Sequence, residues 1–164
     1  MILPYSEITC SPSRNPCRIK MINLWIIAVI LILLQNMAVA NINSEIDSLK
    51  QVIKTVPEDS IRTEAFLRLS DLNNRIDPEI ALFYADSALS ISRKMNDSLL
   101  IADALNNMGI SFYYQGNYPD ALKCYRQSLG IRIQLNDDQG VSRTYNNMGI
   151  VFLLLGEFTE ALKM

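Results

Sequence analysis

The 164-residue sequence has no histidine, three cysteines, one tryptophan and no run of basic residues. Without histidine, the serine–histidine–aspartate and cysteine–histidine catalytic arrangements and the histidine metal sites are excluded. The lack of clustered Lys and Arg argues against a nucleic-acid partner, because binding to phosphates depends on such clusters. No phosphate-binding loop and no metal-ligand spacing is present either. We therefore expect a binding protein of one domain, with no enzymatic activity and no cofactor.

Cysteine and charge are both unevenly distributed along the chain. Cys10 and Cys17 precede an apolar stretch, so that only Cys124 lies in the body of the chain. Once the N-terminal segment is removed, no internal disulfide can form, and we expect Cys124 to be a small packing residue. Residues 1–40 carry three basic residues and one acidic residue, which leaves residues 41–164 mildly acidic.

Residues 1–40 have the order of a secretory signal peptide. Basic residues at 18 and 20 come first, Ile26 to Leu34 contains no polar residue, and Ala38-Val39-Ala40 supplies a small-x-small ending. We predict cleavage after Ala40. The alternative is a retained membrane anchor, although the apolar run is shorter than the about 20 residues that a spanning helix needs.

The start site of this segment is also open, because both Met1 and Met21 can begin the chain and a start at Met21 removes Lys20 from the basic region. In either case we expect an exported protein, periplasmic or extracellular, or anchored in the inner membrane if the segment is kept. Any membrane contact is expected through this segment alone. The following region, 41–61, is expected to hold a short amphipathic helix over 44–56 and a loop.

The rest of the chain repeats with a period of 40 residues. The string Asn106-Asn107-Met108-Gly109-Ile110 recurs unchanged as Asn146-Asn147-Met148-Gly149-Ile150. A further shift by the same period aligns Ala81-Leu82 with Ala121-Leu122. Such a period is the sequence signature of a repeat architecture. The predicted units are 62–101, 102–141 and a shortened third unit, 142–164.

Each unit contains two helical patterns with a break between them. In the middle unit, Asp97 or Ser98 is expected to cap a first helix that runs to Gln115. Gly116 then supplies a residue of positive φ, and Pro119 suits the first turn of the second helix. The architecture predicted for 62–164 is helix–turn–helix, repeated.

The middle unit carries Leu105-x2-Met108-Gly109-x2-Phe112, followed by Gly116-x-Tyr118-x2-Ala121-x3-Tyr125. This pattern resembles the signature of the tetratricopeptide repeat (TPR) family. The period of 40 is similar to that of the long-helix TPRs of kinesin light chains and of bacterial signalling proteins. The resemblance implies an all-α, right-handed solenoid of antiparallel helix pairs.

The repeat register also predicts the core and the end of the array. The aromatic positions expected in the core are Phe112, Tyr118, Tyr125, Phe152 and Phe158. The third unit stops in mid-pattern, so the solenoid is expected to be incomplete at its C-terminus and the chain to be an N-terminal fragment of a longer protein. We expect the last unit to leave Phe152, Leu155 and Ala161 without a covering helix.

In TPR proteins, the groove lined by the first helices of the repeats binds ligands. The resemblance implies that the groove of this chain is lined by side chains of the second and third units, with peptide-contact candidates Asn106, Asn107, Tyr113, Tyr114, Arg143, Asn146 and Asn147. A ladder of asparagine amides suits the alternating N–H and C=O groups of an extended peptide. Alternatively, one asparagine of each pair bonds a neighbouring helix, and the tyrosines serve packing.

The expected function is therefore protein or peptide binding on the exported side of a membrane. We expect the chain to be the sensory or scaffolding part of a longer signalling protein. The alternative is a free-standing periplasmic or secreted TPR adaptor that organises a protein assembly.

Overall fold

The computed structural model describes the backbone of residues 16–164 and the side chains of residues 30–37 and 39–164. The leader residues before Pro16, including Cys10, and the leader side chains up to residue 29 lie outside the described residues. Residues 16–164 form helices and connecting turns, without a strand. The helices are α1 (Pro16–Thr55), α2 (Asp59–Asn73), α3 (Pro78–Met95), α4 (Ser98–Tyr114), α5 (Tyr118–Gln134), α6 (Asp138–Leu154) and α7 (Phe158–Ala161).

Helix α1 runs without a break through Ala40 and ends at Thr55. The sequence led us to expect a separate helix over 44–56, but residues 35–50 contain neither glycine nor proline, so nothing in the chain interrupts the helix. Pro57 disfavours a helical conformation at Val56, which explains the end of α1. No helix within the described residues has an apolar stretch long enough to cross a membrane.

The chain divides into two compact units, Met1–Asn41 and Ile42–Met164. In the second unit, α2 begins at Asp59, ahead of the boundary predicted at residue 62. The early start follows from local sequence, because Pro57 cannot continue α1 and the acidic Asp59 lies in the first turn of α2, where the helix dipole favours negative charge. The remaining helices keep the predicted order of pairs.

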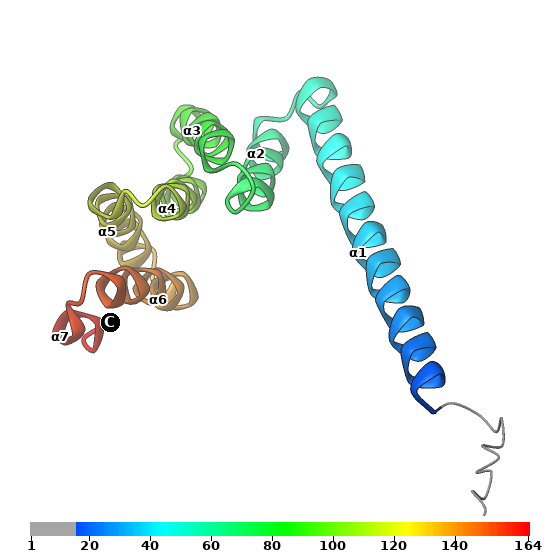
Figure 1. Cartoon of the computed structure of the whole chain (residues 1–164). Helices are drawn as coiled ribbons and strands as arrows, with labels where there is room; N and C mark the ends of the chain where they lie inside the picture. Colours follow the sequence, from blue (N-terminus) through cyan, green and yellow to red (C-terminus); the bar gives the residue numbers. More distant parts are fainter. Residues whose placement is uncertain (1–15) are drawn as a thin grey trace, which may run out of the picture. The chain divides into compact units, whose positions relative to one another are not determined.

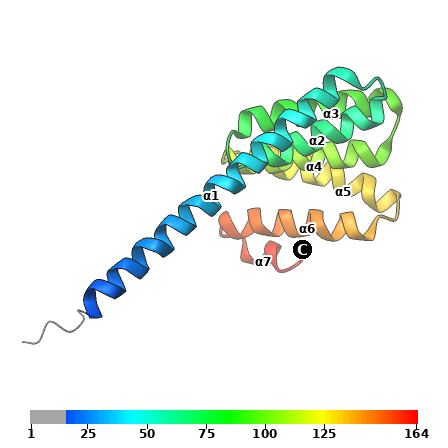
Figure 2. The ribbon, with the colours of Figure 1, turned by 90° about the vertical axis from the view of Figure 1, so that its right-hand side faces the viewer.

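Helices α2 to α7 form consecutive antiparallel pairs, α2 with α3, α4 with α5 and α6 with α7. Figure 1 looks nearly along the axes of α3 and α4, and Figure 2 shows α4, α5 and α6 side by side with the short α7 next to α6. The first helices of neighbouring pairs also touch, α2 with α4 and α4 with α6. We call the surface that these three helices share the first-helix face.

Local interactions end and begin the helices as the sequence predicted. The Asp97 carboxylate accepts a hydrogen bond from the Leu100 backbone N–H and so caps α4. Gly116, with φ of 75°, follows the end of α4. The turn between the second and third units uses Asn136, with φ of 54°, which asparagine adopts at lower cost than most residues. These caps set the length of each helix.

The core of the array confirms four of the five predicted aromatic positions. Tyr125 and Phe152 are buried, whereas Phe112 and Tyr118 are partly buried and pack against the same cluster. Phe158 was predicted as a core residue, and this prediction is wrong, because its side chain is 63% exposed. Its helix, α7, has only four residues, and no further helix of the described chain covers it.

The expectation that Phe152 lacks a covering helix is also wrong. Phe152 is buried against α5 of the preceding unit, in a cluster that includes Leu122 and Tyr125. In a solenoid each first helix packs against both the preceding pair and its own partner helix. The face of α6 that turns toward α5 is therefore covered. Leu155 is exposed, and Ala161 is half-buried.

Candidate functional site

Three consecutive units contribute to one cavity on the first-helix face, of about 310 Å³. We call it the tyrosine pocket. Tyr125 comes from α5, and Arg75 comes from the turn between α2 and α3. The residues that line the pocket are Arg75, Ile110, Tyr113, Tyr114, Tyr125, Asn147 and Ile150.

The tyrosines hold one another in place by edge contacts. The rings of Tyr113 and Tyr114 meet at a centroid distance of 5.1 Å with an interplanar angle of 77°. The ring of Tyr125 lies against Gly109, where an added Cβ would stand 2.5 Å from Tyr125 Cε1. A glycine is therefore required at position 109, because any larger residue would push the ring of Tyr125 out of its place under the pocket.

Arg75 reaches the pocket through a hydrogen bond with Tyr114. Its Nε donates to the Tyr114 hydroxyl oxygen over 2.8 Å, although the two residues are far apart in the sequence. Burial raises the pKa of the Tyr125 hydroxyl above its ordinary value, so Tyr125 stays neutral at physiological pH. The pocket thus combines aromatic and aliphatic walls with one guanidinium group at its edge.

A second cavity, of about 380 Å³, adjoins the tyrosine pocket and shares Arg75, Ile110 and Tyr114 with it. Asp71 of α2 contributes to this second cavity. Together the residues around the two cavities extend along the first-helix face from α2 to α6.

The repeated asparagine pairs occupy different environments in the two units. Asn106 and Asn107 are buried, and the Asn107 amide donates to the backbone oxygen of Leu67 in α2 over 3.1 Å. Asn147 is half-buried and lines the tyrosine pocket, while Asn146 is exposed. Asn107 and Asn147 therefore both bond the preceding first helix, Asn147 through Asn106 Oδ1, and Asn147 also lies at the wall of the tyrosine pocket.

Of the other predicted contact residues, the structure brings Tyr113 and Tyr114 together with Asn147 in one pocket. Arg143 lies outside the pocket, and its side chain is exposed with Nη2 3.9 Å from Asp103 Oδ1. Sequence reasoning missed Arg75, because it belongs to the turn of the degenerate first unit and no repeat motif marks it. Tyr125 was expected in the core and also forms part of the pocket wall.

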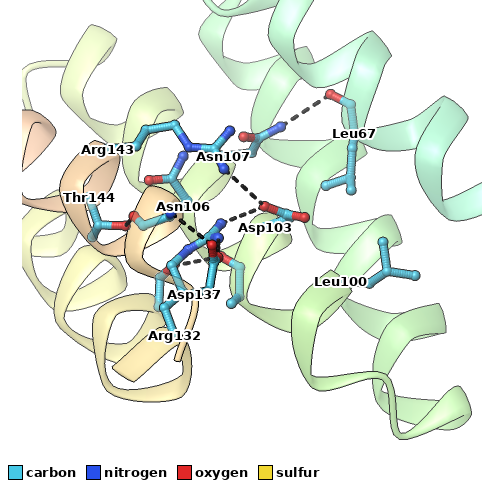
Figure 3. Close-up of polar contacts among 12 residues, drawn as sticks. Leu67, Leu100, Asp103, Asn106, Asn107, Arg132, Asp137, Arg143 and Thr144 are labelled. Atoms are coloured by element: carbon cyan, nitrogen blue, oxygen red, sulfur yellow. Dashed lines mark hydrogen bonds and ion pairs between the residues drawn. The ribbon is translucent and has the colours of Figure 1, made fainter. Parts of the chain in front are cut away.

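A buried arginine joins the second and third units. Arg132 is 1% exposed and donates to Asp103 of α4 and to Asp137 at the start of α6 (Figure 3). Its Nε also donates to Ser128 Oγ over 3.2 Å. We call Arg132, Asp103 and Asp137 the arginine bridge, because these side chains hold α4, α5 and α6 together. Sequence reasoning missed this role of Arg132.

The arginine bridge requires a residue without a side chain at position 140. A Cβ added to Gly140 would lie 2.0 Å from both Arg132 Nη1 and Asp137 Oδ2. The Gly140 backbone N–H donates to Asp137 Oδ1 over 2.9 Å, and this bond, together with Arg132, lowers the pKa of the Asp137 carboxyl below its ordinary value. The bridge therefore holds the beginnings of α4 and α6 against α5.

Cys124 is buried on α5, and burial raises the pKa of its thiol. A raised pKa keeps the thiol protonated and unreactive. The prediction that Cys124 is a packing residue is confirmed.

Comparison with known proteins agrees with this architecture. Residues 100–164 match the family model of the tetratricopeptide repeat. The crystal structure of the TPR domain of Arabidopsis FLU is similar, with a TM-score of 0.60 and 22% sequence identity over 65% of this chain and 90% of that one. At this identity the likeness shows the fold alone.

A second similar structure is that of MamA, with 18% identity over 79% of this chain and 87% of that chain. Its TM-score of 0.30 is too low to support any argument. No curated protein matches the chain.

Proposed function

Residues 100–164 of this chain are tetratricopeptide repeats, and from that premise we propose that the first-helix face binds an extended segment of a partner protein. TPR domains in general mediate protein–protein interactions. For this chain, the observation that carries the proposal is the tyrosine pocket, which lies across three units and has room for one large side chain. Its walls of Tyr113, Ile110 and Ile150 favour an apolar or aromatic side chain.

Arg75 defines a second requirement for the ligand. Three other arginines form ion pairs with carboxylates of the chain. These pairs are Arg68 with Glu45, Arg132 with Asp103 and Asp137, and Arg143 with Asp103. Within the described side chains, Arg75 makes no such ion pair; its Nε bonds a neutral phenol instead. Its terminal amino groups suit an acidic side chain that follows or precedes the buried apolar residue of the ligand.

Asn147 provides a contact to the backbone of the ligand. Its Nδ2 donates to Asn106 Oδ1 over 3.1 Å, which orients the amide and directs its oxygen away from that bond. An amide oxygen held in this way can accept a hydrogen bond from a peptide N–H. The pocket residues therefore offer one apolar, one cationic and one hydrogen-bonding contact to the same short segment.

The test is a selection of peptides from a random phage-displayed library on the immobilised full-length chain. We expect the selected peptides to carry an aromatic or large aliphatic residue next to Asp or Glu. Synthetic versions of these peptides should lose at least about tenfold in affinity for the Tyr113→Ala and Arg75→Gln variants, since one lost contact in the centre of an interface exceeds 1.4 kcal/mol.

The matched control is Phe83→Ala, which removes an aromatic ring of α3 that is 65% exposed and outside the tyrosine pocket. It should leave peptide affinity unchanged. Selected peptides that bind Tyr113→Ala and Phe83→Ala equally well would show that the tyrosine pocket is not the binding site.

We also propose that binding takes place on the exported side of the membrane. The order of basic, apolar and small residues in 1–40 supports this location. N-terminal sequencing of the exported protein should begin at Asn41. An exported protein that still contains Trp25 would contradict cleavage and favour the retained anchor.

Finally, we propose that the chain is the sensory or scaffolding part of a longer signalling protein, with a free-standing adaptor as the alternative. The DNA that follows codon 164 discriminates between the two. A second apolar run of about 20 residues followed by an output domain would support the first. A stop codon after one capping helix would support the adaptor.

A further inference from the structure

Helix α4 has a second surface that lies away from the tyrosine pocket. Ile101 and Ile110 are about two and a half turns of α4 apart, so they face opposite sides of the helix. Ile110 lines the tyrosine pocket, whereas Ile101 lines a separate cavity of about 420 Å³. The floor of this cavity is α4 and its walls are α3 and α5, the two helices between which α4 packs (Figure 1). We call it the arginine trough.

The arginine trough has an apolar floor and one arginine on each wall. Leu105 is 5% exposed and belongs to a cluster of the core, against which Ile101 and Ile131 also pack. Arg93 comes from the last turn of α3, and Arg126 comes from α5, so a guanidinium group stands on each side of the apolar floor. The other residues around the trough are uncharged. Within the described chain, therefore, no carboxylate lines it.

Arg93 and Arg126 differ from the other arginines whose side chains are described. Each of those others pairs with a carboxylate or, in the case of Arg75, bonds the Tyr114 hydroxyl. Arg93 and Arg126 are both exposed, and among the described side chains they make neither an ion pair nor a hydrogen bond. Two guanidinium groups without a counter-charge in one cavity favour an anionic occupant, because arginine binds carboxylates strongly.

Gly130 lowers the wall of the trough next to Arg126. It lies inside α5, where glycine makes a helix less stable than alanine does. Its φ is not positive, and nothing lies within 4 Å of an added Cβ, so neither the backbone nor the packing of the chain requires glycine here. Glycine does allow a ligand to approach a backbone closely. An occupant of the trough can therefore come close to α5 at this position.

We propose that the arginine trough binds an acidic amphipathic helix of a partner protein. A helix that lies along the trough places an apolar stripe on the floor and carries carboxylates on both sides of that stripe, next to Arg93 and Arg126. An extended strand is a poorer match, because its side chains alternate between two faces and do not flank one apolar stripe on both sides. The trough and the tyrosine pocket lie on opposite sides of α4, so this site is additional to the binding proposed above.

The probe is a fluorescently labelled synthetic peptide that is held helical by a covalent staple. It has a stripe of leucines with glutamates on both sides, and a second peptide has lysine in place of every glutamate. Each peptide is titrated with the full chain, and binding is followed by fluorescence anisotropy. We expect saturable binding of the glutamate peptide and at least about tenfold weaker binding of the lysine peptide, because like charges repel at the two arginines.

The decisive variant of the chain combines Arg93→Gln with Arg126→Gln. Its affinity for the glutamate peptide should fall at least about tenfold, since both charge-assisted contacts are lost. The matched control combines Lys94→Gln with Lys123→Gln, which removes the same charge from exposed positions of the same two helices outside the trough. This control should bind the peptide nearly as tightly as the wild type.

The Gly130→Leu variant tests the shape of the trough. An added side chain has open space there, so we expect the helical circular dichroism of the variant to match that of the wild type. Its affinity for the glutamate peptide should fall at least about tenfold, because the leucine occupies the space of the bound helix. Tyr113→Ala, which alters the tyrosine pocket, should leave this affinity unchanged.

Three results would overturn the proposal. One is the absence of saturable binding of the glutamate peptide to the wild-type chain. Another is an equal loss of affinity in the arginine and the lysine variants, which would show attraction by net charge alone. The third is a wild-type chain that sediments as a dimer and becomes monomeric when Arg93 and Arg126 are replaced, which would assign the trough to a second copy of this chain.

Discussion

Asn147 donates its side-chain amide to Asn106 Oδ1 over 3.1 Å, so that two members of the repeated asparagine pairs bond to each other across neighbouring units. The acceptor, Asn106, is 4% exposed, while Asn147 lies at the wall of the tyrosine pocket. Two asparagines at different positions of the repeated pair are therefore linked, although their burial differs. One belongs to the interior of the array, and the other connects the interior with the surface at which we place the ligand.

The Asn107→Ala variant should lower the free energy of unfolding by about 1 kcal/mol, because it removes a buried hydrogen bond to Leu67 O. Peptide affinity per folded molecule should stay unchanged. Urea denaturation and titration with a peptide selected on the tyrosine pocket measure the two quantities. The control is Asn146→Ala, which changes an exposed amide and should leave stability within about 0.5 kcal/mol. A stable Asn107→Ala variant with weak peptide binding would instead make Asn107 a ligand contact.

Substitution of two helical glycines by alanine should shift stability in opposite directions. Gly140→Ala places a methyl group 2.0 Å from Arg132 Nη1 and should be destabilising, although alanine is the better helix former. Gly130→Ala, in open space on α5, should stabilise by about 0.5–1 kcal/mol. The midpoints of thermal unfolding of the two variants measure the difference. Stabilisation by both substitutions would show that the arginine bridge does not restrict position 140.

Arg132→Met should lower stability by about 2–3 kcal/mol, since it removes charge-assisted hydrogen bonds to Asp103 and Asp137 from a side chain that is 1% exposed. The two carboxylates are partly exposed and can be solvated, which keeps the loss below that of a fully buried pair. Chemical denaturation measures it. Arg126→Met, which alters an exposed arginine of the same helix, is the matched control and should have little effect.

Stability should fall in acid partly through Asp137. The pKa of Asp137 is lowered in the folded chain, first by the Gly140 N–H and then by Arg132. A lowered pKa means that Asp137 contributes stability above its unfolded pKa of about 4 and loses it as the pH falls through the folded pKa. The Asp137→Asn variant keeps a capping side chain and removes the charge. Its melting temperature should therefore drop less between pH 6 and pH 3 than that of the wild type, at about the same ionic strength.

Much of the fold follows from short stretches of sequence. The period of 40 is visible in the sequence itself, and the capping carboxylate of Asp97 and the positive φ of Gly116 depend on interactions within a few residues. Such local preferences can be predicted from a single sequence because the interacting groups lie close together along the chain. The residue pattern also identified Tyr113, Tyr114 and Asn147 as members of one surface, since equivalent positions of stacked repeats lie side by side.

Tertiary structure alone decided which of these side chains are accessible and what completes the site. Arg75 reaches Tyr114 across two units, and Arg132 is buried between two carboxylates that come from different helices. Phe158 occupies a repeat position that was predicted to lie in the core, but its side chain is exposed. Burial at this position depends on a neighbouring helix and not on the residue type alone. The sequence by itself determined the repeat, its helices and their order. Contacts between distant segments decided which asparagines are buried and where the pocket lies.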